Sequence, residues 1–144
     1  MVIGIFGESC TGKSTLAEKI AAGLSCEVFA EKDYLRLAKN ENIAKILFQK
    51  KLAAAVNSGN IIYVISEKEH LALLPEETIR ILVTADLEVI KSRFTQRMHG
   101  VLPAPVAAML EKKHGTFDTQ PHDYHVISGV SDLEAVVAQI KTRF

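Results

Sequence analysis

One feature constrains the fold of this chain more than any other, and it is the glycine-containing stretch Gly7–Ser14, which reads Gly-Glu-Ser-Cys-Thr-Gly-Lys-Ser. It follows the short apolar run Val2–Phe6 and precedes a segment in which Leu16, Ile20 and Leu24 recur every four residues. The apolar run predicts a buried strand, and the recurring residues predict an amphipathic helix. A strand joined to a helix by a glycine-containing turn is typical of α/β folds.

The rest of the chain repeats this alternation. Further strands are predicted at 26–30, 61–65, 79–83 and 124–127, and further helices at 34–39, 43–56, 87–98, 104–113 and from 133 onward. Asp86 is expected to cap the helix after the fourth strand, and Ser131 with Glu134 has the spacing of a capping box. Alternating strands and helices predict a parallel sheet with helices on both faces, so residues 1–144 form one three-layer α/β domain.

Charge and cysteine content narrow the classes of partner. Lys plus Arg and Asp plus Glu both number 17, and this balance argues against a general nucleic-acid or membrane-surface binder. Cys10 and Cys26 have neither metal-ligand spacing nor the density of a disulfide scaffold. No apolar run approaches the roughly 20 residues of a membrane helix, and the N-terminus lacks signal-peptide features. A cytoplasmic protein is expected, and its oligomeric state stays open.

The stretch Gly7–Ser14 matches the pattern G-x-x-x-x-G-K-[ST] of phosphate-binding loops. Glycines let the backbone N–H groups approach phosphate oxygens, and the following helix directs its positive end at the same anion. Lys13 would reach the β- and γ-phosphates, and the Ser14 hydroxyl would bind Mg²⁺. The pattern therefore predicts binding of a nucleoside triphosphate, with ATP as the first choice. The predicted nucleotide-binding residues of this loop are Gly7, Glu8, Ser9, Cys10, Thr11, Gly12, Lys13, Ser14 and Thr15.

Other segments separate the classes of phosphate-loop protein. The chain has no N-K-x-D motif for guanine and is short for a motor ATPase, which leaves the size class of small-molecule kinases. The run Phe29–Arg36 resembles the junction after the second strand in adenylate kinases, and Ala85–Gly100 is similar to the segment that leads into their lid. The end of the chain, Tyr124–Phe144, resembles cytidylate and shikimate kinases equally well. Most of the chain therefore resembles the nucleoside-monophosphate-kinase-like group, which implies the strand order 2-3-1-4-5.

This resemblance implies roles for individual residues. Arg93 and Arg97 fall on one flank of a helix, and in the group the first stacks on adenine while the second contacts phosphates. Asp33 corresponds to an acid of the Mg²⁺ shell or of the acceptor hydroxyl, Arg36 to an arginine that holds an acceptor phosphate, and Gly129 would border the base. Simpler interpretations stay open: Asp33 also suits a helix N-cap, with Glu31 as the substitute acid, and the arginines also suit a solvated surface.

Three departures from the group's pattern bear on the acceptor. The segment after the third strand, Ile65–His70, has no acceptor-binding arginine, and its Glu67 is either an acid of the Mg²⁺ shell or the start of a surface helix. The lid is reduced to about 98–105 and brings no arginine of its own, and the acceptor-binding region at about 34–58 is also reduced. Lys112 and Lys113 stand where the group usually has a catalytic arginine, and lysine lacks its planar bidentate grip.

Two functions of different classes follow. The first is an ATP- and Mg²⁺-dependent phosphotransferase that moves the γ-phosphoryl group to a small-molecule acceptor. Lys13 and Arg97, with Lys112 or Lys113, would stabilise the transferred charge, and Asp33 would position the acceptor. The second is a regulatory or partner-binding module that binds nucleotide with little or no transfer, as the missing arginines would allow. An NTPase without an acceptor is a third, less favoured interpretation.

Overall fold

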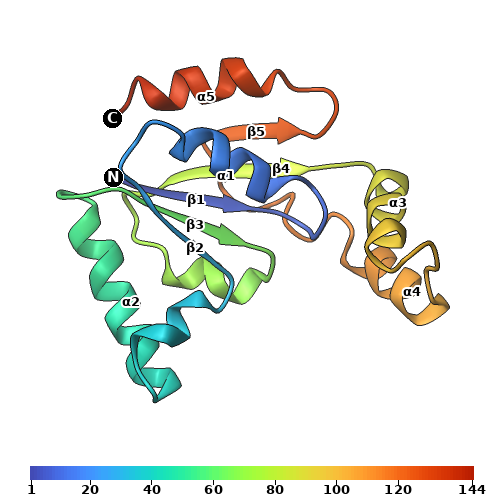
Figure 1. Ribbon diagram of the computed structural model, residues 1–144, viewed down its shortest axis with the longest axis horizontal. Coiled ribbons are helices and arrows are strands. Elements are labelled where there is room, and N and C mark those ends of the chain that lie inside the picture. The colour runs from blue at the N-terminus through green and yellow to red at the C-terminus, as the bar shows by residue number, and fades with distance from the viewer.

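The computed structural model describes residues 1–144 and contains one parallel sheet of five strands (Figure 1). The strands are β1 (Val2–Phe6), β2 (Glu27–Ala30), β3 (Ile61–Ile65), β4 (Ile79–Thr84) and β5 (Tyr124–Ile127). Their order in the sheet is β2-β3-β1-β4-β5, and every neighbouring pair is parallel. The predicted fold class and strand order are confirmed.

Helices cover both faces of this sheet (Figure 1). The α-helices are α1 (Lys13–Ala21), α2 (Glu41–Ala55), α3 (Leu87–Arg97), α4 (Ala104–Lys113) and α5 (Leu133–Lys141), and the 3-10 helices are η1 (Asp33–Leu37) and η2 (Lys68–Leu73). Helices α1 and α5 pack together on one face, and α2, η1 and η2 lie on the other. No helix has both the length and the apolar character that crossing a bilayer would require.

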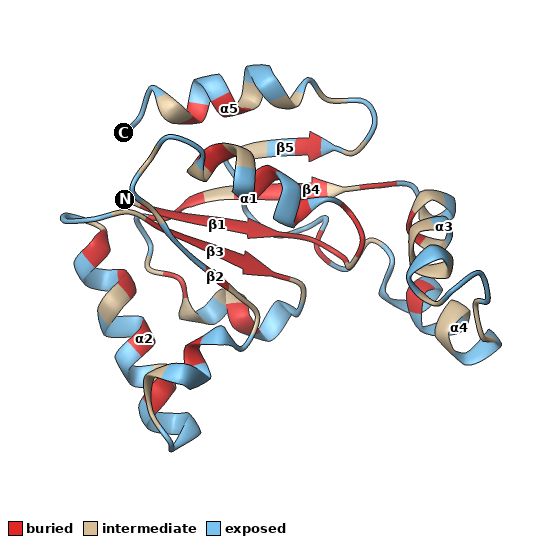
Figure 2. Cartoon of the chain, in the orientation of Figure 1, coloured by how far each residue is buried: buried red, intermediate tan, exposed pale blue.

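Successive side chains of a strand point to opposite faces of the sheet. Because helices cover both faces, the central strands are buried on both sides. In β1, Val2 and Phe6 pack in the cluster with α2, whereas Ile3 and Ile5 pack in the cluster with α1 and α5. Figure 2 shows β1 and β3 buried along their length. This two-sided burial explains why the strands read as unbroken apolar runs rather than as alternating patterns.

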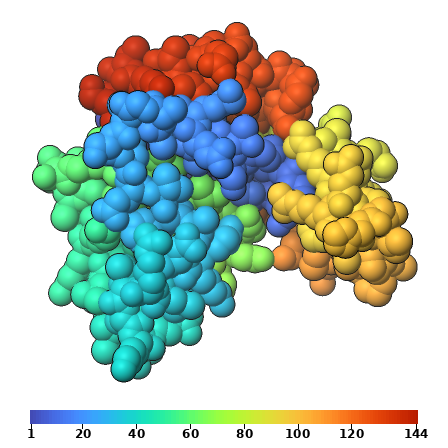
Figure 3. Space-filling model, in the orientation of Figure 1, coloured from blue at the N-terminus to red at the C-terminus, as the bar shows by residue number.

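Helices α3 and α4 form a lobe at the edge of the sheet where the strands end (Figures 1 and 3). The lobe has its own small core, in which Ile90 of α3 and Leu110 of α4 are buried with Ala85 and Cys10. Cys10 belongs to the loop between β1 and α1, so the glycine-containing loop and the α3–α4 lobe share apolar contacts.

Several helix boundaries differ from the sequence predictions. Helix α2 begins at Glu41 rather than at residue 43, because the Asn40 side chain accepts a hydrogen bond from the Ile43 amide. Helix α5 is capped by Asp132, whose carboxylate accepts from Ala135 N, and not by a capping box starting at Ser131. The Ser131 hydroxyl is unavailable as a cap because it accepts from Ile127 N where the chain leaves β5.

Two other local predictions also need correction. Asp86 occupies the N-cap position of α3, but its side chain makes no capping hydrogen bond, and the first bond of the helix runs from Ile90 N to the Asp86 carbonyl oxygen. The segment predicted as a helix at 34–39 is the 3-10 helix η1, which starts at Asp33 and ends at Leu37. The 3-10 helix η2 has Glu67 as its N-cap residue, so the alternative prediction of a surface helix starting at Glu67 is confirmed. Its extent, 68–73, was not predicted, because a short 3-10 helix has no amphipathic repeat long enough to detect.

Candidate nucleotide-binding site

The loop between β1 and α1 lies at the carboxyl ends of the strands, and its backbone requires glycine at two positions. A Cβ atom on Gly7 would lie 2.1 Å from the carbonyl oxygen of Val83, so no larger residue fits between β1 and β4. Gly12 has a φ of 96°, a left-handed conformation that side chains disfavour. Both glycines of the sequence pattern are therefore required by the backbone geometry itself.

Lys13 is the first residue of α1, and its side chain is buried against the loop. Its ammonium donates a hydrogen bond of 2.6 Å to the Glu8 carbonyl oxygen, so the side chain arches over the loop. Burial lowers the pKa of Lys13 to about 8, and the nearby Glu31 carboxylate opposes this shift. A phosphate group in the loop would give this buried ammonium an anionic partner, so the residues present fit a triphosphate.

A hollow of about 240 Å³, which we call the loop pocket, opens in front of Lys13. Its polar lining comes from the segments that follow β1, β2 and β3 and from the end of α3, and it includes Ser9, Lys13, Ser14, Glu31, Ser66 and Arg97. Glu31 and Cys10, which both line it, have left-handed φ values of 52° and 64°. Strained backbone of this kind costs about 1–3 kcal/mol per residue and is concentrated at functional sites.

The loop pocket also has oxygen donors suited to magnesium. The Ser14 hydroxyl and the Glu31 carboxylate line the same pocket, while no group of three or more His, Cys, Asp or Glu side chains could hold a metal alone. Magnesium at phosphoryl-transfer sites is held by one or two carboxylates together with substrate phosphates rather than by an all-protein cage. The residues therefore fit an ion that is shared with the nucleotide.

Two buried residues, Tyr63 and His70, contact Glu31. Tyr63 donates a hydrogen bond of 2.7 Å to the Glu31 carbonyl oxygen, and the Nδ1 atom of His70 lies 3.6 Å from the Glu31 carboxylate. His70 is buried, and its Nδ1 has no hydrogen-bond partner, so Glu31 is the nearest acid that it can pair with. Sequence reasoning missed His70, because an isolated histidine in a polar run carries no signal of its own.

The structure does not bring Asp33 into the loop pocket. Its carboxylate accepts a hydrogen bond of 2.9 Å from Ala30 N, and the residue is exposed. The alternative prediction of a helix cap is wrong as well, because Lys32 holds the N-cap position of η1 and Asp33 is the first residue inside the helix. The acid that lines the pocket is Glu31, at a left-handed position of the backbone just past β2.

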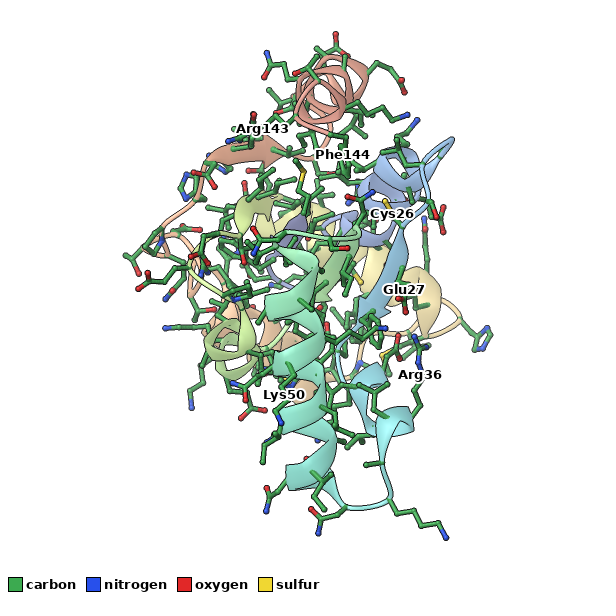
Figure 4. The ribbon with its side chains drawn as sticks, turned by 90° about the vertical axis from the view of Figure 1, so that its left-hand side faces the viewer. Cys26, Glu27, Arg36, Lys50, Arg143 and Phe144 are labelled. Atoms are coloured by element: carbon green, nitrogen blue, oxygen red, sulfur yellow. The ribbon has the colours of Figure 1, made fainter.

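Arg36 and Glu67 also lie apart from Ser14. The Arg36 guanidinium stacks over the Phe29 ring at 4.3 Å from its centroid, and Figure 4 shows Arg36 on the flank of η1. Glu67 lies 3.3 Å from the Lys113 ammonium and lines a different pocket from the one that contains Ser14. The magnesium role predicted for Glu67 therefore lacks the geometry that Glu31 has.

A second hollow, which we call the arginine pocket, has a volume of about 560 Å³ and lies between the loop, α3 and the turn after β5. Arg93 donates hydrogen bonds of 2.9 Å to the Cys10 carbonyl oxygen and to the Ser128 hydroxyl, and so joins all three elements. Arg97 lines both the arginine pocket and the loop pocket, and Gly129 lines the arginine pocket. The structure thus brings together both predicted arginines, the loop and Gly129. The volume is within the range of small-molecule sites.

A third hollow, which we call the Phe117 pocket, has a volume of about 210 Å³ and lies on the other side of the loop pocket. Ser9 and Ser66 line both of these pockets, so the two adjoin. The Phe117 pocket also contains Glu8, a buried carboxylate that lies 3.0 Å from His114 Nδ1 and accepts from Gly115 N at 3.2 Å. The three pockets therefore form a row along the carboxyl edge of the sheet.

We compared the chain with family models, curated protein sequences and solved structures, and only the solved structures gave matches. No family model and no curated protein sequence matches the chain. Similar solved structures include a proposed kinase from Chloroflexus aurantiacus (18% identity, TM-score 0.68, covering 99% of this chain and 97% of the other). They also include a shikimate kinase from Acinetobacter baumannii in complex with shikimate (13%, 0.65, 99% and 91%) and a gluconokinase from Sinorhizobium meliloti (15%, 0.60, 96% and 87%).

This chain has the fold of P-loop small-molecule kinases. The similarity extends over nearly the whole length of both partners in each pair, so the shared fold includes the α3–α4 lobe as well as the sheet. In the P-loop kinase fold, as in other open parallel sheets, ligands bind outside the carboxyl ends of the strands. The row of three pockets lies at this edge.

Proposed function

We propose that this chain is an ATP- and Mg²⁺-dependent phosphotransferase that moves the γ-phosphoryl group to a small-molecule acceptor. The observation that carries the proposal is the row of three adjoining pockets at the carboxyl edge of the sheet. The arginine pocket would hold the nucleoside, the loop pocket the phosphates, and the Phe117 pocket the acceptor. Phosphoryl transfer needs donor and acceptor oxygens in line, and adjoining pockets for donor and acceptor support such an arrangement.

Within the loop pocket, each residue has a defined task. The backbone N–H groups from Gly7 to Gly12 and the Lys13 ammonium would bind the phosphates, and Ser14 with Glu31 would hold Mg²⁺. Bound magnesium neutralises charge on the phosphate oxygens. Arg97, which lines both the arginine and the loop pockets, would stabilise negative charge on the transferring group.

Glu31 is our candidate for the acid of this site in place of Asp33. Glu31 lines the pocket together with Lys13 and Ser14, whereas the Asp33 carboxylate is bound to Ala30 N. We do not assign Arg36 to the acceptor, because it stacks on Phe29 and lines none of the three pockets. We also propose a cytoplasmic location, since both cysteines are free thiols.

The names of similar structures support a small-molecule acceptor. One of those structures contains shikimate, a small compound that carries hydroxyl groups, and another is named a gluconokinase. Neither name transfers to this chain at 13% and 15% identity. The acceptor class therefore includes nucleotides, nucleosides and other small hydroxyl compounds.

Turnover with and without acceptors tests the proposal. ADP release should rise when a mixture of small hydroxyl compounds and nucleotides is added, and mass spectrometry should detect a product heavier by one phosphoryl group. Lys13→Ala is the matched control, since it should lose ATP binding and turnover together while the circular-dichroism spectrum stays that of the folded protein. Unchanged ATP affinity in folded Lys13→Ala would refute nucleotide binding in the loop.

One observation favours the alternative of a nucleotide-binding module without transfer. The segment 98–105 contains no arginine, and Arg97 is the one guanidinium that lines the loop pocket. Under this alternative, ATP would bind with an affinity that depends on Lys13, but no acceptor would accelerate ADP release. The turnover experiment therefore separates the two functions without further design.

A further inference from the structure

The chemistry of the Phe117 pocket narrows the class of acceptor, an inference that rests on the proposed phosphotransferase function. The pocket adjoins the loop pocket through Ser9 and Ser66, and the loop pocket is lined by Lys13, which would bind the terminal phosphates of a triphosphate. A compound in this pocket is therefore next to the group that is transferred.

The formal charges of the side chains that line the Phe117 pocket sum to zero. Its lining contains the carboxylates of Glu8 and Glu67 and the ammonium groups of Lys68 and Lys113, so its formal charge is zero. Glu67 and Lys113 are paired with each other at 3.3 Å. Glu8 is bound to His114 and to the backbone amide of the next residue. Lys68 is exposed and carries a flexible point charge.

No arginine lines this pocket. Of the five arginines in the chain, Arg36 stacks on Phe29, Arg93 and Arg97 line the arginine pocket, and Arg80 and Arg143 line neither the loop pocket nor the Phe117 pocket. A phosphate on the acceptor would lie near two carboxylates and the γ-phosphate with no guanidinium to bind it. The one ammonium of the lining without an acid partner is the exposed Lys68, which offers a flexible point charge instead of a bidentate grip. Beside two carboxylates this is weak compensation for a phosphate, so the pocket disfavours phosphorylated compounds.

The uncharged groups that can contact a ligand are hydroxyls and apolar side chains. Ser9, Ser66 and Thr116 supply the hydroxyls, and the apolar side chains are those of Met109, Leu110 and Phe117. The volume of about 210 Å³ is below the roughly 300–1,000 Å³ of sites for drug-sized ligands. The ligand is therefore small, and hydroxyl groups can face the serines while a carbon face lies on Phe117.

We infer that the acceptor is a small neutral compound with several hydroxyl groups and no phosphate, such as a monosaccharide, a cyclic polyol or a nucleoside. One of its hydroxyl oxygens forms the new bond to the γ-phosphorus, the bond from that phosphorus to the β–γ bridging oxygen breaks, and ADP leaves. The hydroxyl proton passes to solvent or to a carboxylate of the site. The product carries one phosphoryl group.

Binding of matched pairs of compounds tests the inference. Each pair consists of a neutral monosaccharide, cyclic polyol or nucleoside and its own monophosphate, titrated in a calorimeter into wild-type protein with Mg²⁺ and a non-hydrolysable ATP analogue. The neutral member of at least one pair should bind, and its monophosphate should bind at least about tenfold more weakly, the factor that 1.4 kcal/mol represents. Tighter binding of the monophosphate, or no binding by any neutral member, would overturn the inference.

A charge substitution tests the reason for that preference. Glu67→Gln removes the partner of Lys113 and leaves a free ammonium in the pocket, so the monophosphates should bind about tenfold more tightly than to wild type. Glu27→Gln is the matched control, because Glu27 pairs with Lys51 at 3.0 Å with similar exposure. Glu27 begins β2, at the end of the sheet away from the pockets, on the side that faces the viewer in Figure 4.

The outcomes distinguish this inference from the proposed function. If a neutral compound binds in the ternary complex but receives no phosphoryl group, the phosphotransferase proposal fails while the ligand class of the pocket stands. If a monophosphate is phosphorylated efficiently, the phosphotransferase proposal stands and the neutral acceptor is refuted. Equal monophosphate affinity in wild type, Glu67→Gln and Glu27→Gln would also refute it, because the Glu67–Lys113 pair would then have no effect on ligand charge.

Discussion

The Glu8 carboxylate lies 3.0 Å from the Nδ1 of His114, although 106 positions separate the two residues along the chain. The other oxygen of the same carboxylate accepts from Gly115 N at 3.2 Å. Glu8 belongs to the phosphate loop, and His114 and Gly115 follow α4 directly. The loop and the end of the α3–α4 lobe are therefore joined by one buried carboxylate.

Removing this carboxylate should loosen the end of α4. In Glu8→Ala, the Gly115 amide loses its acceptor, and hydrogen bonds to charged groups contribute about 1.5–3 kcal/mol. Hydrogen exchange at Gly115 and its neighbours should accelerate by about 10- to 100-fold, while exchange in β1 and β3 stays slow. Glu18→Ala on the exposed side of α1 is the control and should change neither. Unchanged exchange at Gly115 would mean that apolar packing alone holds the lobe.

The low pKa of Lys13 predicts that ATP binding takes up protons. At pH 8 about half of the Lys13 side chains are uncharged in the free protein, because burial lowers the pKa to about 8. A bound triphosphate favours the charged ammonium, so binding near pH 8 should take up about half a proton, and affinity should fall as the pH rises further. Calorimetry in two buffers of different ionisation enthalpy measures this uptake. Lys13→Arg, which does not titrate in this range, should show none.

The same shift affects stability with a definite sign. Between pH 8 and 10.5 the unfolded chain keeps the Lys13 proton that the folded protein has lost, so stability rises with pH over this window. Below pH 8 both states are protonated, and the cost of burying the charge is fully present. Denaturant unfolding of wild type and Lys13→Met at pH 7.5 and 10 isolates this contribution. The wild type should gain more than the variant on going to pH 10, and an equal change in both would place the titration elsewhere.

The extent to which this structure could be predicted differs between the fold and the site. Strand and helix positions followed from local patterns, because the loop Gly7–Ser14 fixes the first strand–helix unit and the central strands β1 and β3 are continuous apolar runs. The strand order was implied only by the resemblance to the nucleoside-monophosphate-kinase-like group, and the structure confirms it. The arginines were also within reach, since Arg93 and Arg97 share a helix flank whatever surrounds them. Periodicity is a local property, so features that depend on it alone survive folding unchanged.

The choice between Glu31 and Asp33 was beyond the sequence for a physical reason. It depends on a left-handed φ at Glu31 and on the Ala30 amide, which captures the Asp33 carboxylate as the chain leaves β2. No residue pattern in the sequence indicates the turn, because glycine and asparagine are the usual signals for left-handed backbone and this residue is a glutamate. The hydrogen bond to Ala30 N has no sequence pattern either. The contacts of Glu8 with His114 and of Glu67 with Lys113 were equally hidden, since they join segments far apart in the chain.

Kinetic measurements should distinguish the roles of Arg93 and Arg97, the two arginines of α3. Arg97→Ala should lower kcat by about 10²-fold or more with a smaller effect on ATP binding, because charge on the transferring group develops mainly in the transition state. Arg93→Ala should instead weaken ATP binding by roughly 0.5–2 kcal/mol through loss of a stacking cation. It should also lower Tm, because it removes bonds to the Cys10 carbonyl and Ser128. Equal and small effects in both variants would place the arginines on a merely solvated surface.

The acid of the site is decided by comparing Glu31→Gln with Asp33→Asn. The amide oxygen introduced by Asp33→Asn could still accept from Ala30 N, so this variant keeps the turn and should leave both Tm and turnover close to wild type. Glu31→Gln removes the carboxylate that lines the pocket with Ser14, so it should raise the Mg²⁺ concentration needed for half-maximal turnover and reduce kcat by about 10²-fold or more. It also removes the charge that raises the Lys13 pKa, so the pH above which ATP affinity falls should move below 8. This last readout needs no turnover, and it tests whether the Glu31 charge acts on Lys13 in the pocket. Lost turnover in Asp33→Asn with full activity in Glu31→Gln would reverse the assignment.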